Sequence, residues 1–308
     1  MTETANIIPL HRLIAHQSWQ HIQTSDMTEL AQFADSLNIS AAFLEKVQDP
    51  DEIPHLERKG EQRFVLLLAP RMQHDMDAPL YVDTVPIGIV LHTGGVATIG
   101  NHPLPLWQRL QKRFERRSES PFKAERFLAQ LYLELAKDFY HSLDMVDKQL
   151  KLAKESLRNS QSNQQFFRLL SLQKSLIYVT SALQSDLATG ERLMHSTRWH
   201  GSDIDNDQLQ DALSDFLQAR ETAKLMAKLI TNTMDAFAGT LQNNISAAIR
   251  TVTAWTVIIT VPIAVISVMA MNTPTPGRHW LLAWPVLMGG SFLVSGLLYW
   301  FLRRWHWL

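Results

Sequence analysis

The 308-residue chain contains no cysteine, which excludes disulfide bonds and metal sites built on thiolates. It also lacks an excess of basic residues, because 29 lysines and arginines stand against 30 acidic residues. Proteins that bind nucleic acids usually carry a basic excess, so this balance argues against nucleic acid as a partner. The first residues, MTETANIIPL, have neither the basic nor the apolar region of a signal peptide. We therefore expect the N-terminal region to stay in the cytoplasm.

Motifs of catalysis are also missing from the sequence. It has no glycine-rich phosphate-binding loop and no Ser/His/Asp or Cys/His arrangement with supporting context. We therefore expect no enzymatic activity, no ATP hydrolysis and no organic cofactor. Among the twelve histidines, His11, His16 and His21 are five residues apart and do not share a helix face well. We interpret the histidines as surface or core residues rather than as a structural metal site.

Charge is absent from two long stretches near the C-terminus. Residues 251–277 contain no Asp, Glu, Lys, Arg or His, and residues 280–302 form a second uncharged run. The apolar part of the first run, residues 252–271, has the roughly 20 residues that a helix needs to cross a bilayer. Only residues 272–279 (NTPTPGRH) separate the runs, so we predict a transmembrane hairpin in a lipid bilayer.

Basic residues flank these two predicted spans unequally. Arg250 precedes the first span, and Arg303 with Arg304 follows the second, whereas the loop between them has one arginine, Arg278. Positive charge favours the cytoplasmic side of a membrane. We therefore predict a multi-pass protein of the cell membrane with both termini in the cytoplasm and the short loop outside.

Before this tail the sequence predicts a soluble region, of mixed α/β structure over residues 1–118. Residues 63–72 (RFVLLLAPRM) form an apolar run of strand length, and residues 86–100 resemble two strands joined at Gly94-Gly95. Residues 120–157 and 166–194 show helical spacing on either side of a polar break, which predicts an antiparallel pair. A third helical pattern runs from about residue 207 to 271.

Pro262 is the only proline of this third helix, and a transmembrane helix tolerates proline when the freed carbonyl finds another partner. Only about a third of such a helix fits in a bilayer, so the rest must form a cytoplasmic stalk. The predicted domains are an α/β domain (1–118), a helical pair (119–206), a stalk (207–251), a first transmembrane helix (252–271), an extracytoplasmic loop (272–279), a second transmembrane helix (280–302) and a basic tail (303–308).

A row of small polar residues recurs every seven positions along the third helix. It comprises Asn232, Gly239, Ser246, Thr253, Thr260 and Ser267, and Asp235 lies near the same face. In one interpretation the hydroxyls donate to carbonyls of their own helix and allow close helix packing. In the other, identical helices around an axis line a wet pathway with rings of weak oxygen ligands. Spacing leaves both open, and the acid at Asp235 favours a cation pathway.

The segment from Met234 to Asn272 reads MDAFAGTLQNNISAAIRTVTAWTVIITVPIAVISVMAMN. It resembles the CorA family of divalent-cation channels and transporters, in which an MDAFA-like stretch, an Ile-Pro-Thr stretch and a Gly-Met-Asn motif lead to the end of the first span. Residues 174–186 (KSLIYVTSALQSD) and the tail of two arginines followed by WHWL also resemble the family. The resemblance covers roughly residues 120–308 well and the N-terminal region loosely.

The resemblance implies a CorA-like fold and a homopentamer in which five first-span helices line a pore for Mg²⁺. Ala270, Met271 and Asn272 stand where Gly-Met-Asn belongs, so Asn272 would place side-chain carbonyls at the outer mouth. Neutral oxygens suit Mg²⁺, which gives up its waters reluctantly. Transport would run on the membrane potential. Cytoplasmic Mg²⁺ held by Asp211 and Asp215 would close the pore.

The predicted pore-lining residues are Asp235, Ser246, Thr253, Thr260 and Ser267. The resemblance implies a pore position for Asp235 and Ser246, and the seven-residue spacing adds the other three. The chain departs from the family pattern in several places. Ala270 replaces a glycine, Ser246 replaces an inner pore asparagine, and the loop carries no acid. Two alternatives therefore remain: a transporter of Zn²⁺, Co²⁺ or Ni²⁺ with the same fold, or a membrane-anchored sensor or scaffold that does not conduct.

Overall fold

The computed structural model describes residues 8–9, 18–73, 81–116, 122–159, 163–196, 201–271 and 282–305. The chain divides into two compact units, Met1–Met234 and Asp235–Leu308, here called the N-terminal and C-terminal units. One continuous helix, α6 (Asp203–Met269), belongs to both units. The long third helix predicted from the sequence is therefore confirmed.

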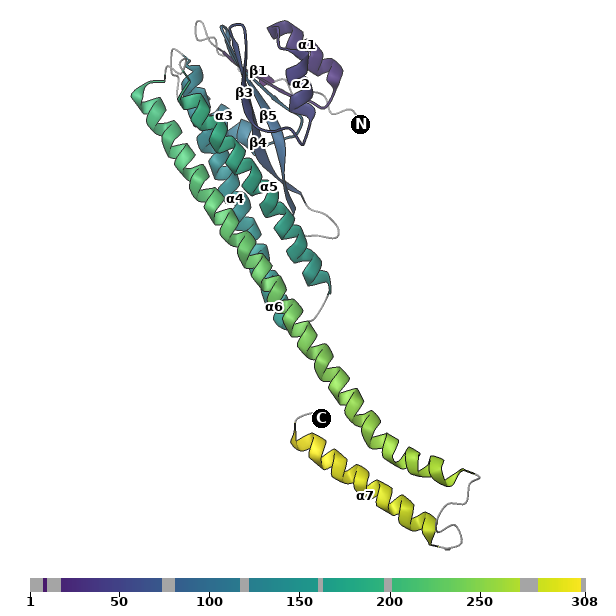
Figure 1. Ribbon diagram of the computed structural model, residues 1–308. Coiled ribbons are helices and arrows are strands. Elements are labelled where there is room, and N and C mark those ends of the chain that lie inside the picture. The colour runs from purple at the N-terminus through teal and green to yellow at the C-terminus, as the bar shows by residue number, and fades with distance from the viewer. Residues whose placement is uncertain are drawn as a thin grey trace. The chain divides into compact units, whose positions relative to one another are not determined.

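A six-stranded mixed sheet forms the centre of the N-terminal unit (Figure 1). Its order is β1-β2-β6-β5-β4-β3, and only β2 and β6 pair in parallel. The strands are β1 (Ile8–Pro9), β2 (Ser18–Gln23), β3 (His55–Lys59), β4 (Gln62–Gln73), β5 (Tyr81–His92) and β6 (Gly95–Gly100). The predicted strands thus correspond to β4, β5 and β6, with the turn at Thr93 and Gly94.

Helices cover both faces of this sheet, and the alternation of side chains along β4 shows why. Phe64 and Leu66 point to one face, where α1 (Met27–Leu37) and α2 (Ala41–Gln48) pack. Val65 and Leu67 point to the other face, which is covered by α3 (Pro105–Arg116), α4 (Ala124–Asn159) and α5 (Asn163–Met194). A strand buried on both faces reads as a continuous apolar run, which is the pattern of residues 64–69.

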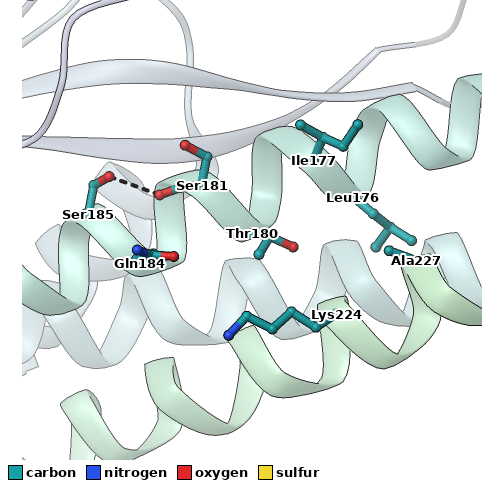
Figure 2. A pocket seen from close by; sticks show the side chains of 8 residues that line it. All are labelled: Leu176, Ile177, Thr180, Ser181, Gln184, Ser185, Lys224 and Ala227. Carbon is teal, nitrogen blue, oxygen red and sulfur yellow. Dashed lines mark hydrogen bonds between the residues drawn. The ribbon is translucent and has the colours of Figure 1, made fainter.

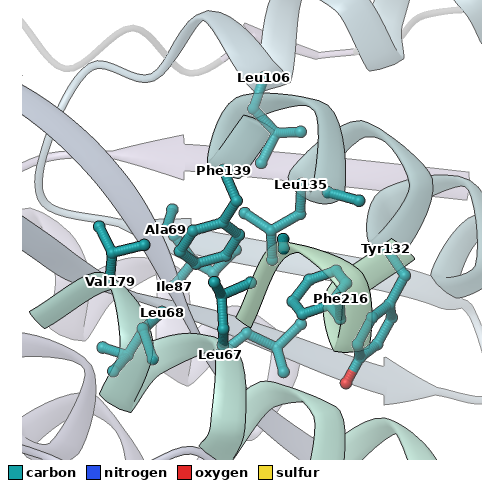
Figure 3. Close-up of a cluster of buried hydrophobic side chains, with 14 of the residues drawn as sticks. Leu67, Leu68, Ala69, Ile87, Leu106, Tyr132, Leu135, Phe139, Val179 and Phe216 are labelled. Atoms are coloured by element: carbon teal, nitrogen blue, oxygen red, sulfur yellow. The ribbon is translucent and has the colours of Figure 1, made fainter. Parts of the chain in front are cut away.

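The larger core joins this sheet to the long helices (Figure 3). Phe139 of α4 and Phe216 of α6 meet with ring centroids 5.5 Å apart, and both are fully buried. Gly190 of α5 lies so close to α4 and α6 that a β-carbon there would overlap the Leu213 side chain and crowd the Tyr132 ring. Glycine at this position therefore permits the close approach of three helices.

Two polar side chains of α5 complete the hydrogen bonding of the sheet. The first residue of β3, His55, pairs with Leu66, so Leu68 of β4 lies beyond this strand. The Leu68 N–H donates to Asp186 Oδ1 at 3.0 Å. The N–H of Val82 lies beyond the end of β6 and donates to Ser175 Oγ at 2.9 Å. Buried N–H groups need such partners. The side chains of α5 thus supply the acceptors that neighbouring strands do not.

Helices α4 and α5 form the predicted antiparallel pair (Figure 1), whereas α6 begins four residues before the predicted start at residue 207. Ser202 caps it reciprocally: the Asp205 N–H donates to Ser202 Oγ at 3.3 Å, and the Ser202 N–H donates to Asp205 Oδ2 at 3.1 Å. Arg126 Nε donates to Asp205 Oδ1 at 2.9 Å. This Ser-x-x-Asp capping box moves the helix start ahead of the predicted boundary at residue 206.

The C-terminal unit contains the end of α6 and the helix α7 (Ala283–Arg304). Both helices are long and apolar enough to cross a membrane, and only 6% and 11% of their most apolar windows are buried. Residues 252–269 of the first predicted span lie at the end of α6, and residues 283–302 of the second lie in α7. Arg303 and Arg304, predicted to open the tail, form the last turn of α7. The predicted loop, residues 272–279, lies outside the described residues.

Candidate ion-conduction site

One face of α6 packs against α7 in the C-terminal unit. Ala254 and Ile258 of α6 are 1% and 9% exposed, and Ser291 and Ser295 of α7 are 4% and 6% exposed. The two residues of each pair are one helical turn apart on the same helix, so each pair forms a small contact surface that matches the other. The rings of Trp255 and Tyr299 extend the contact, with centroids 6.2 Å apart.

The predicted polar row lies on a different face of α6. At 100° per residue, Thr253 and Thr260 stand about 130° around the helix from the Ala254–Ile258 face. Thr253, Thr260 and Ser267 are exposed, and Ser246 is half-buried. α7 does not cover the row, which is left for lipid, water or other copies.

Two hydroxyls of this row donate their protons to backbone carbonyls of α6. Thr260 Oγ1 donates to the Thr256 carbonyl at 2.7 Å, and Ser267 Oγ donates to the Ile263 carbonyl at 2.9 Å. These are the bonds within one helix expected in the first interpretation of the row. A hydroxyl that has given its proton to the backbone still has lone pairs. Its oxygen can accept from the waters of a hydrated cation, so the two interpretations are compatible.

Asp235 continues the row at its N-terminal end. It lies 18 residues before Thr253, which is about five whole helical turns, so both residues stand on one face. Its side chain is exposed. A carboxylate on the same face as the hydroxyls adds a negative charge that attracts cations.

The predicted selectivity residues follow the end of α6. The N–H of Ala270 donates to the Ile266 carbonyl at 3.0 Å, and that of Met271 donates to the Val268 carbonyl at 3.3 Å. Both residues are exposed. Asn272, the residue predicted to select the ion, lies outside the described residues, and its role stays a prediction.

The predicted regulatory acids lie on α6 in the N-terminal unit. Asp211 is exposed and Asp215 is half-buried, and the Tyr140 hydroxyl donates to the Asp215 carbonyl at 3.3 Å. Burial and the nearby charge of Asp215 raise the pKa of Tyr140. Within the described ranges, no group of three or more His, Cys, Asp or Glu side chains could hold a metal ion.

A groove of 460 Å³ runs between α5 and α6 in the N-terminal unit (Figure 2). It is lined by Leu176, Ile177, Thr180, Ser181, Gln184, Ser185, Lys224 and Ala227. No acid is among these lining residues, and Lys224 brings a positive charge. The groove is thus a poor site for a cation.

These features define a class: a membrane protein with an α/β domain, one very long helix and a two-helix C-terminal unit. Residues 15–304 match the family described as CorA-like Mg²⁺ transporter protein, and the chain belongs to that family. The predicted family is therefore confirmed, and the chain is a member of a family of membrane ion transporters. No curated protein sequence gives a significant match to the chain.

Solved structures share the fold at low sequence identity. The complete structure of the CorA magnesium transporter from Methanocaldococcus jannaschii has a TM-score of 0.81 at 18% identity, covering 95% of this chain and 92% of that one. Full-length CmaX has a TM-score of 0.70 at 17% identity, covering 97% and 91%. The ZntB cytoplasmic domain from Vibrio parahaemolyticus has a TM-score of 0.58 at 14% identity, covering 75% and 90%. The predicted CorA-like fold class is confirmed.

Proposed function

We propose that the protein is a homopentameric channel that carries Mg²⁺ into the cytoplasm across the cell membrane. The observation that carries this proposal is the polar row of α6, which faces away from α7 and continues to Asp235. The family match and the likeness to a structure described as a magnesium transporter support it. The membrane potential would drive entry, since moving a divalent ion through 100 mV is worth about 4.6 kcal/mol.

In this proposal five copies of residues 252–271 surround the pore, and residues 280–302 form an outer ring. Ser246, Thr253, Thr260 and Ser267 would then form rings of hydroxyl acceptors that hold the waters of a hydrated ion. At the outer mouth, Ala270 and Met271 would lead to five Asn272 side chains. Neutral amide oxygens suit an ion that keeps its hydration shell.

Exposed apolar side chains of the N-terminal unit support self-association. Ile177 of α5 is 61% exposed, and Leu225 and Leu229 of α6 are 70% and 44% exposed. On α6, Leu225 and Leu229 are one helical turn apart and form an exposed apolar surface of the kind that marks contacts between proteins. We assign this surface to contacts between copies in the pentamer.

Gating by cytoplasmic Mg²⁺ is the regulatory part of the proposal. The stalk, residues 207–251, would place Asp211 and Asp215 beside a neighbouring copy. Mg²⁺ bridging carboxylates there would hold the stalks together and close the pore. Loss of bound Mg²⁺ would leave like charges facing each other and would favour opening.

The test is Mg²⁺ influx into liposomes that contain the purified protein and a Mg²⁺-sensitive dye. Saturable influx under an inside-negative potential, blocked by hexammine cobalt, would support passage of hydrated Mg²⁺. Hexammine cobalt suits this test because it mimics the hydrated ion. Absence of Mg²⁺ influx would refute the choice of ion.

A second candidate function is transport of Zn²⁺, Co²⁺ or Ni²⁺. The fold similarity to the ZntB cytoplasmic domain favours it, as does the acid-free loop. Influx of one of these ions without Mg²⁺ influx would select this candidate. Absence of influx for every ion tested would favour the remaining alternative, a sensor or scaffold that does not conduct.

A further inference from the structure

Pro262 leaves one backbone carbonyl of α6 without its helical donor. Proline has no N–H, so the carbonyl of Ile258, four residues earlier, receives no hydrogen bond from position 262. In the apolar interior of a membrane, water does not replace the missing donor. The Ile258 carbonyl therefore needs another donor.

Ser295 of α7 supplies this partner. Its Oγ donates to the Ile258 carbonyl at 3.0 Å, and both residues are buried in the contact between α6 and α7. A buried serine in a helix usually donates to a carbonyl of its own helix. Ser291, one turn earlier on α7 and equally buried, does so: its Oγ donates to the Met288 carbonyl at 2.8 Å. Ser295 instead donates to the neighbouring helix.

We infer that Ser295 is a positioning residue of the proposed conduction helix, because its hydroxyl replaces the N–H that Pro262 lacks and fixes the turn between Ile258 and Pro262. This turn carries Thr260, whose hydroxyl belongs to the polar row and donates to the Thr256 carbonyl. A shift of the turn would therefore move a pore-lining oxygen. The effect on ion flow rests on the proposed function, whereas the brace between the helices does not.

A double-mutant cycle tests the brace on the full-length oligomer. The variants are Ser295→Ala, Pro262→Ala and the combination, and the measurement is the unfolding rate in mixed micelles with sodium dodecyl sulfate. Ser295→Ala should speed unfolding roughly threefold to tenfold, as loss of an interhelical hydrogen bond in a membrane predicts. In the Pro262→Ala background the same change should have less than about a twofold effect, because the restored N–H bonds the Ile258 carbonyl.

Two further variants separate the hydroxyl from simple packing. Ser291→Ala is the matched control: its effect on unfolding should be the same in both backgrounds, because its hydroxyl bonds within α7. Ser295→Thr should retain the wild-type unfolding rate more fully than Ser295→Val, which has the same shape without the hydroxyl. Equal effects of Ser295→Ala in both backgrounds would overturn the inference.

Ion flux gives the functional readout in the same variants. Ser295→Ala should change influx by a similar threefold to tenfold factor, while Ser291→Ala leaves it near wild type. Unchanged flux in Ser295→Ala, alongside a positive cycle, would refute the positioning role but not the brace. If the wild type conducts no ion at all, the proposed function fails, and the unfolding cycle still decides whether Ser295 braces α6.

Discussion

In the N-terminal unit, the leucine, isoleucine and valine side chains in the middle of β4 and β5 are buried, whereas most of the same residue types on α7 and the end of α6 are exposed. The N-terminal unit covers both faces of its sheet with its own helices. The C-terminal unit has two helices, which cover little of each other. An apolar segment therefore predicts different environments in the two units of this chain. In a water-soluble domain it predicts a core, and in the tail it predicts a surface for lipid or for other copies.

The two units also satisfy buried backbone groups in opposite ways. In the sheet, the groups left over at Leu68 and Val82 are N–H donors, and α5 provides a carboxylate and a hydroxyl oxygen as acceptors. In the C-terminal unit the group left over at Ile258 is a carbonyl, and Ser295 provides a hydroxyl donor. The end of a strand pairing thus leaves N–H groups without acceptors, and a proline leaves a carbonyl without a donor. In each case a side chain from a neighbouring helix provides the missing partner.

The largest expected effect separates conduction in the C-terminal unit from folding of the N-terminal unit. Asn272→Ala should abolish Mg²⁺ influx into liposomes, because it removes the proposed ring of amide oxygens at the outer mouth. Assembly, measured by light scattering during gel filtration, should be unchanged. Thr275→Ala in the same loop is the control and should conduct. Full influx by Asn272→Ala would refute the assigned role.

Lowering the pH should destabilise the N-terminal unit, which contains His21, but not the C-terminal unit. Burial against Trp107, with ring centroids 4.6 Å apart, lowers the pKa of His21 to about 4. In the unfolded chain His21 takes up a proton near pH 6.5, whereas in the folded chain it stays neutral down to about pH 4. The contribution of His21 to the free energy of unfolding is therefore fully present above pH 6.5. It should fall by about 3 kcal/mol between pH 6.5 and 4.

Hydrogen exchange of β2 and β6 amides in the full-length protein measures this loss. His21→Phe keeps an aromatic ring beside Trp107 but cannot titrate, so its stability should fall less over the same pH interval. An identical pH dependence in the variant would show that other groups cause the loss. Amides of α7 serve as the internal reference from the C-terminal unit.

Glycine substitutions should act unequally on the two units. Gly190→Ala in α5 forces a methyl against Leu213 and Tyr132 and should cost roughly 2 kcal/mol of stability. Gly289→Ala in α7 is the matched control, because within 4 Å a β-carbon there would meet no atom of the described residues apart from the neighbouring backbone of its own helix. Thermal unfolding of both variants measures the difference. A larger loss for Gly289→Ala would point to close packing of α7 against another copy.

The smallest expected effect concerns Asp186, whose carboxyl is fully buried. Burial raises its pKa well above the ordinary value, although the hydrogen bond from Leu68 opposes this. The unfolded chain releases the proton first, so this carboxyl lowers stability as pH rises above about 4. Asp186→Asn keeps an acceptor without a proton to lose. It should be more stable than wild type at pH 7, and this advantage should shrink towards pH 4.

Asp186→Ala is the control for the hydrogen bond itself. It leaves the Leu68 N–H without an acceptor and should be roughly 1–2 kcal/mol less stable than Asp186→Asn. Denaturant unfolding at pH 7 and pH 4 measures both differences. If Asp186→Asn and Asp186→Ala had equal stability, the acceptor would contribute nothing.

Much of the fold could be predicted because its signals are local or periodic. The apolar run of β4, the helical spacing of α4 and α5 and the two uncharged stretches each lie within one segment. The start of α6 could also have been found, because Ser202 and Asp205 form a capping box in the sequence. The polar row was predicted from seven-residue spacing alone. The role of Asn272 remains a prediction.

The sequence by itself determined the membrane segments, the long helix and the face on which its polar residues gather. Only the tertiary structure decided which face of α6 packs on α7, and that Asp186 and Ser295 partner backbone groups 118 and 37 residues away. The reason is physical. Periodicity within one element follows from backbone geometry, whereas a contact between elements depends on their relative rotation and depth, which no local spacing encodes.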